Sequence, residues 1–118
     1  MPHINVEYSK DLKGKLNRKA LAKALHAAAV EIADAKIENC KTRFLERDEL
    51  YLGDMQKEAS MLHIDIAVFA SRTAEQKSKL GEKALMLAQQ HLVETARKVF
   101  VSVHISDLNP KTYFAAVQ

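Results

Sequence analysis

The sequence predicts an α/β (α+β) fold: duplicated β-α-β units that form a four-stranded sheet with two helices on one face. Residues 3–8 and 63–68 both alternate apolar and polar side chains with the period of a strand, and they stand 60 positions apart. Each is followed by a stretch with helical spacing and then by a further alternating segment. We therefore expect one domain over residues 1–118, with a pseudo-repeat of 2–47 and 62–106.

The first unit opens with the strand at residues 3–8. A helix follows it, with Asn17 as the N-cap and apolar residues at the i, i+3, i+4 and i+7 positions of one face. These residues are Leu21, Ala24, Leu25, Ala28 and Ile32. Residues 40–44 keep a weaker alternation and are expected to form the second strand. Residues 48–58 then link the two units.

The second unit repeats this order. Thr73 and Gln76 have the spacing of a capping box at the start of its helix. The apolar stripe of that helix consists of Leu80, Ala84, Leu87, Ala88 and His91. Gly81 weakens the helix by about 1 kcal/mol relative to alanine. Residues 99–106 alternate cleanly as the last strand, which Asn109 and Pro110 end.

The composition limits the cellular compartment and the binding partners that we expect for this protein. The single cysteine cannot form an internal disulfide, and no apolar run reaches the ~18 residues that span a bilayer. No signal-peptide pattern opens the chain, because His3, Asn5 and Glu7 interrupt its apolar residues. We expect a cytoplasmic protein with no membrane partner. The formal net charge of +3 is small for a nucleic-acid binder but suits a small anionic ligand.

Pro2 carries the most chemical information. An initiator Met before a small residue is normally trimmed, so Pro2 is expected to become the first residue. A proline nitrogen inside a chain is an amide whose lone pair is lost to resonance. At a free terminus it is a secondary amine, and burial or nearby cations lower the pKa of such an amine. Pro2 then suits general-base catalysis near pH 7, although many chains begin Met-Pro without any catalytic role.

Several motifs together resemble the tautomerase superfamily, and within it the 5-carboxymethyl-2-hydroxymuconate isomerase family. They are the opening PHINVEYS, the strand KTRF, the strand and loop LHIDIAVFASR with the following TAEQK, and the closing ISDLNPKTYF. The resemblance runs through the whole chain. It implies a homotrimer and a cofactor-free keto-enol isomerase of aromatic catabolism, which moves a proton along a 2-hydroxymuconate-type dienol carboxylate.

The resemblance also implies roles for four residues. Pro2 matches the general acid/base, and Arg72 matches the carboxylate-binding arginine of the loop after the third strand. Lys41 and Arg43 are expected to be the further substrate-binding cations, which stabilise a developing enolate oxygen. The family has an arginine where this chain has Lys41, and Arg43 follows two residues later on the same strand face. Lysine is a point charge that cannot grip a carboxylate with two parallel hydrogen bonds. This departure puts the preferred substrate in doubt.

Two other functions stay open. The first is a catalytically silent binding module of the same fold, which the lysine at position 41 motivates. The second is an RNA-binding module on the helix-free sheet face, whose strands offer only Phe69 and Phe100 for base stacking. A metal site is not expected, because the histidines lack ligand spacing and Cys40 stands alone. The uncovered sheet face instead suggests a subunit interface.

Overall fold

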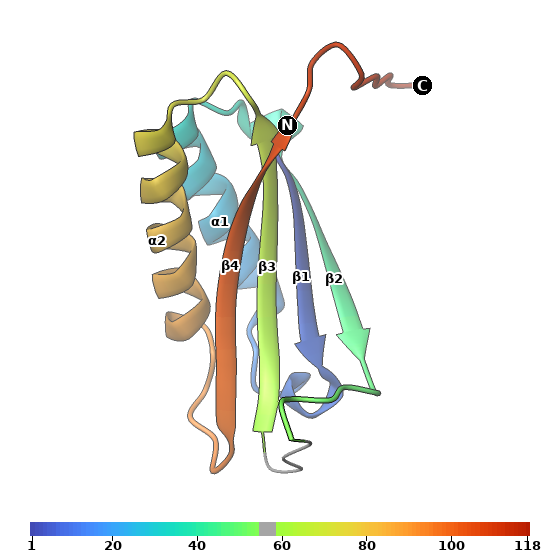
Figure 1. The fold of residues 1–118 in the computed structure, drawn as a ribbon, viewed down its shortest axis with the longest axis vertical. Helices are drawn as coiled ribbons and strands as arrows, with labels where there is room; N and C mark the ends of the chain where they lie inside the picture. Colours follow the sequence, from blue (N-terminus) through green and yellow to red (C-terminus); the bar gives the residue numbers. More distant parts are fainter. Residues whose placement is uncertain (55–58) are drawn as a thin grey trace.

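The computed structural model describes residues 1–54 and 59–118. Its order of strands and helices is β1, α1, β2, β3, α2, β4, which confirms two successive β-α-β units (Figure 1). The strands are β1 (His3–Ser9), β2 (Lys41–Arg47), β3 (Ala59–Phe69) and β4 (Lys98–Leu108), and the helices are α1 (Arg18–Ala33) and α2 (Ala74–Gln90). Short 3₁₀ turns occupy Lys10–Leu12 and Ile37–Asn39.

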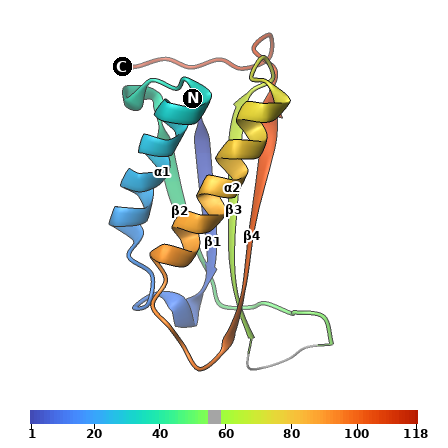
Figure 2. The same ribbon diagram turned by 90° about the vertical axis from the view of Figure 1, so that its left-hand side faces the viewer.

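The four strands form one mixed sheet in the order β2-β1-β3-β4. β1 and β2 are parallel, β3 and β4 are parallel, and the two units meet where β1 runs antiparallel to β3. His3 lies opposite Ala67, so the start of β1 adjoins the end of β3. Both helices cover the same face of this sheet, as the sequence predicts, and the other face is uncovered (Figure 2).

The core lies between the sheet and the two helices. The alternate residues of β1 and β3 that face the helices are buried, and they pack against one apolar face of each helix. The largest of these side chains are Ile4, Val6, Tyr8, Leu21, Leu25, Leu62, Ile64, Ile66 and Leu80. In residues 1–54 and 59–118 no helix combines the length and apolar character that a membrane crossing requires.

The predicted helix starts are confirmed. The Asn17 side chain accepts a hydrogen bond from the Ala20 amide at 3.2 Å, and Thr73 and Gln76 form the reciprocal capping box at 3.1 and 2.9 Å. The placement of His91 within the stripe of α2 is wrong. His91 is the C-cap, and its ring Nδ1 donates to the Leu87 carbonyl at 2.7 Å.

The strands extend beyond their predicted bounds. β3 and β4 pair continuously from Ala59 opposite Lys98 to Phe69 opposite Leu108. Alternation marks only part of a strand, whereas the hydrogen bonds to a neighbouring strand continue as long as the neighbour does. β2 likewise begins one residue later and ends three residues later than predicted. The predicted link ends where β3 begins, but its residues 55–58 lie outside the described part of the chain.

Gly81 is a place where the fold tolerates a better helix former. A Cβ atom added there would meet only the Ile105 side chain, at 3.5 Å, which is ordinary van der Waals contact. We expect Gly81→Ala to raise the free energy of unfolding by about 1 kcal/mol, because alanine costs less backbone entropy in a helix. Thermal unfolding at a fixed protein concentration measures this. A lower melting temperature than wild type would show that α2 cannot accept the methyl group against β4.

Candidate active site

Pro2 lies at the end of the sheet where β1 begins and β3 ends. It is buried, and it lines a cavity together with Met1 and residues from the end of α1 and the end of β3. The other lining residues are Ala33, Ala35, Val68, Phe69 and Arg72. The cavity holds only about 10 Å³, room for about one water molecule. While Met1 remains attached, the Pro2 nitrogen is an amide, and Met1 itself lines the small space beside it.

Arg72 is directed to the same cavity by the elements around it. It follows β3 in a turn, where its amide donates to the Phe69 carbonyl at 3.1 Å, and the capping box of α2 begins at the next residue. Its side-chain Nε donates to the Ala33 carbonyl in the last turn of α1. Carbonyls in the last turn of a helix lack a partner within the helix, so this contact suits both groups. Within the described part of the chain, the other guanidinium N–H groups of Arg72 have no protein acceptor and are available to an anion.

Lys41 lies beside the amino terminus. It opens β2, opposite His3 in the parallel ladder. Its Nζ donates to the Asn39 carbonyl at 3.2 Å, and the Met1 amine donates to the same carbonyl at 2.7 Å. The pKa of the Met1 amine lies below its ordinary value, first because of burial and second because of the Lys41 charge. A chain-terminal amine in this corner is therefore pushed toward its neutral form.

Arg43 belongs to the uncovered face of the sheet. Its Nη2 lies 3.2 Å from Nδ1 of His3, the residue that follows Pro2. Neither Arg43 nor Lys41 is among the residues described as lining the Pro2 cavity. The structure thus brings Pro2 and Arg72 to one cavity, places Lys41 at the terminal amine, and places Arg43 on the His3 ring.

Sequence reasoning missed one residue at this end of the sheet, Tyr113. Its hydroxyl lies 2.6 Å from Nε2 of His3, and its ring packs edge-on against Phe69 at 5.8 Å between centroids. Phe69 itself lines the Pro2 cavity. Tyr113 stands in the closing motif ISDLNPKTYF, but nothing in that motif indicates a contact with His3.

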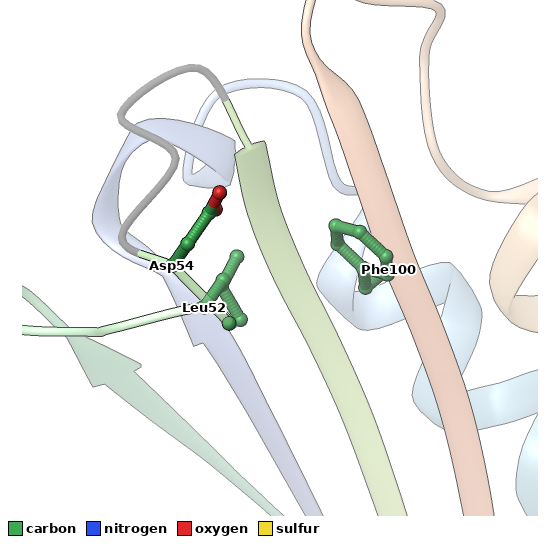
Figure 3. A pocket seen from close by; sticks show the side chains of 4 residues that line it. Leu52, Asp54 and Phe100 are labelled. Carbon is green, nitrogen blue, oxygen red and sulfur yellow. The ribbon is translucent and has the colours of Figure 1, made fainter.

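A second hollow, of about 300 Å³, lies at the opposite end of the sheet (Figure 3). Leu52, Gly53, Asp54 and Phe100 line it. Tyr51, which precedes Leu52 in the chain, is not in this described lining. Among the described lining residues there is a carboxylate, Asp54, and no cation, so this described part suits an anionic ligand less well than the Pro2 corner does. Across the described residues, no three His, Cys, Asp or Glu side chains gather as a metal site would require.

Comparison with known families identifies the chain. The sequence profile of the 5-carboxymethyl-2-hydroxymuconate isomerase family matches residues 2–116. The chain belongs to this family. Among curated protein sequences, no significant match is found. The match covers the Pro2 corner, both β-α-β units and Tyr113, and membership of the family supports an activity of the isomerase or tautomerase type.

Solved structures agree with this membership at the level of the fold. A 5-carboxymethyl-2-hydroxymuconate isomerase from Deinococcus radiodurans R1 is similar over 99% of this chain and 90% of its own, with 19% identity and a TM-score of 0.87. A 5-carboxymethyl-2-hydroxymuconate delta-isomerase is similar over 100% of this chain and 89% of its own, with 17% identity and a TM-score of 0.78. A fused 4-OT described as a symmetric trimer is similar over 97% of this chain and 91% of its own, with 21% identity and a TM-score of 0.75.

Proposed function

We propose that this member of the 5-carboxymethyl-2-hydroxymuconate isomerase family is a cytoplasmic, cofactor-independent keto-enol tautomerase of aromatic catabolism. Its substrate class is a 2-hydroxymuconate-type dienol carboxylate, and Pro2, freed by loss of Met1, is the general acid/base. The observation that carries the proposal is the shared cavity of Pro2 and Arg72, with Lys41 next to Pro2, to whose carbonyl the Lys41 amide donates at 3.1 Å. The test is ketonisation of the generic enol phenylenolpyruvate by chains with and without a free Pro2.

The reaction needs one proton carrier and positive charge. The neutral Pro2 amine takes the proton of the enol hydroxyl; the O–H bond breaks, the C=O bond forms, and the π electrons shift along the conjugated chain. The protonated amine then returns the proton to a carbon, where a C–H bond forms. Arg72 holds a carboxylate, and Lys41 and Arg43 stabilise the negative charge that develops on oxygen. No step in this sequence requires a cofactor or a metal.

We also propose that the protein is a homotrimer. The uncovered sheet face carries exposed apolar residues such as Phe100 of β4, which is 53% exposed. A monomer of this size gains stability by covering such a face. The fused 4-OT structures similar to this chain are described as a symmetric and an asymmetric trimer. Sedimentation of the purified protein measures the mass of the assembly, and a monomeric mass would contradict the proposal.

Lys41→Met is expected to move the acid limb of the pH–rate profile to higher pH. A cation beside the amine disfavours its protonated form, so removing the cation raises the pKa of the catalytic amine. Below that pKa the base is protonated and inactive, so the variant loses activity at a higher pH than wild type does. The profile of kcat/KM against pH reports the pKa of the free enzyme. Superimposable acid limbs would show that Lys41 does not act on the amine.

A catalytically silent binding module is the second candidate. The lysine at position 41, where the family has an arginine, favours it, because the point charge grips a carboxylate less specifically. Such a module would bind a carboxylate in the same corner but would ketonise phenylenolpyruvate no faster than the uncatalysed reaction does. A rate above that background, abolished by blocking Pro2, rejects the silent module.

A further inference from the structure

Three side chains from distant parts of the sequence meet on the uncovered face beside Pro2. Arg43 of β2 contacts Nδ1 of His3 at 3.2 Å, and Tyr113 of the C-terminal segment contacts Nε2 of the same ring at 2.6 Å. The His3 and Tyr113 rings pack edge-on at 5.5 Å. His3 is thus held on both nitrogens, and its orientation is fixed by two partners.

The chemistry of the three groups sets the direction of these hydrogen bonds. A guanidinium has only donors, so Arg43 donates and Nδ1 of His3 accepts. The single proton of the neutral imidazole must then be on Nε2, which donates to the Tyr113 oxygen. Burial lowers the pKa of His3, and the charges of Arg43, the terminal amine and Lys41 lower it further, in agreement with a neutral ring. The Tyr113 oxygen is therefore an acceptor toward His3.

The hydroxyl proton of Tyr113 can therefore be donated to another acceptor. Within residues 1–54 and 59–118, the Tyr113 hydroxyl has the His3 ring as its hydrogen-bond partner, and that bond uses the oxygen rather than the O–H group. A phenol that accepts from a polarised donor becomes a stronger donor itself. Phe69 connects the Tyr113 ring to the cavity of Pro2 and Arg72, because it lines the cavity and packs edge-on against that ring. Tyr113 thus contacts two residues of this corner, Phe69 of the cavity lining and His3, which follows Pro2.

We propose that Arg43, His3 and Tyr113 form a donor chain that ends in the Tyr113 hydroxyl, and that this hydroxyl donates to a carboxylate oxygen of the bound substrate. The proposal rests on the proposed function for the identity of the site. It assigns Tyr113 as a substrate-binding residue and His3 as a positioning residue, and it gives Arg43 a second task beside charge stabilisation. Tyr113 then favours substrates with a carboxylate far enough from Arg72 to reach it.

The test is the binding of cis,cis-muconate, a six-carbon dicarboxylate that lacks the enol hydroxyl. Calorimetric titration of wild type and Tyr113→Phe is expected to show about tenfold weaker binding to the variant, the size of a hydrogen bond to a charged acceptor. Phenylalanine keeps the ring contact with Phe69 and removes only the hydroxyl. Tyr51→Phe is the matched control, because the Tyr51 hydroxyl contacts Glu49 outside this site, and it is expected to bind muconate as wild type does.

A second measurement examines the donor chain without any ligand. The ¹⁵N shifts of the His3 ring, assigned by comparison with His3→Gln, are expected to show the Nε2–H form at pH 7. An Nδ1–H ring or a charged ring at that pH overturns the proposal. So does equal muconate affinity in Tyr113→Phe and wild type, or the absence of muconate binding to wild type. If Pro2→Ala keeps full activity, the proposed function fails while both of these measurements still decide the role of Tyr113.

Discussion

A chain that begins at Pro2 is expected to ketonise phenylenolpyruvate at least about a hundredfold faster than the same chain with Pro2 blocked. General acid–base catalysis by a positioned group contributes about 10²- to 10⁴-fold. A blocked Pro2 has an amide nitrogen without a usable lone pair. The blocking residue also lines the cavity beside Pro2, which holds only about 10 Å³ with Met1 in place.

One protein preparation provides both forms. A removable amino-terminal tag whose cleavage leaves Pro2 as the first residue allows the rate to be measured before and after cleavage, with intact mass as the check. Pro2→Ala, which keeps a terminal amine but loses the rigid secondary amine, should lose most turnover with an unchanged circular dichroism spectrum. Equal rates in the tagged and cleaved forms would exclude Pro2 as the base.

Arg72→Ala is expected to lower kcat/KM about 30- to 100-fold, mostly through KM. The substitution removes a charge-assisted hydrogen bond to a carboxylate, worth about 2–3 kcal/mol. Arg72→Lys should recover only part of this loss, because lysine keeps the charge but cannot form two parallel hydrogen bonds. Steady-state kinetics at pH 7 give kcat/KM and KM for both variants.

The control for Arg72 must separate binding from folding. Arg72 also holds the Ala33 carbonyl at the end of α1, so its loss alone lowers stability somewhat. Melting temperatures of the variants measure this loss of stability. Arg47→Ala is the matched control, because Arg47 pairs with Glu7 at the other end of β2 and should leave KM unchanged. A KM for Arg72→Ala equal to that of wild type would remove Arg72 from the site.

The fold was predictable where a local rule acts. Alternation identified each strand and helical spacing each helix, and the caps at Asn17 and Thr73 are confirmed because a side-chain acceptor three residues from an amide is a local feature. The ends of the strands were not predictable, because a partner strand distant in the sequence sets them. β4, for example, continues to Leu108 only because Phe69 lies opposite.

The site was predictable only in part, for the same reason. Pro2 is marked by its position next to the initiator Met, and the resemblance to the family marks Arg72. The contact between His3 and Tyr113 joins residues 110 positions apart. No periodicity or motif connects them, so only the folded chain shows that the C-terminal segment reaches the corner where β1 begins. The same is true of Arg43, whose contact with His3 depends on the register of β1 and β2.

The titration of the Pro2 amine itself tests the central claim most directly. In protein labelled with ¹⁵N-proline, the amine signal followed against pH should give a pKa below the ordinary value of about 8 for a chain-terminal amine. The same pKa should govern the acid limb of kcat/KM. A missing amine signal, or an amine that stays protonated at pH 7 while the protein is fully active, would contradict the account.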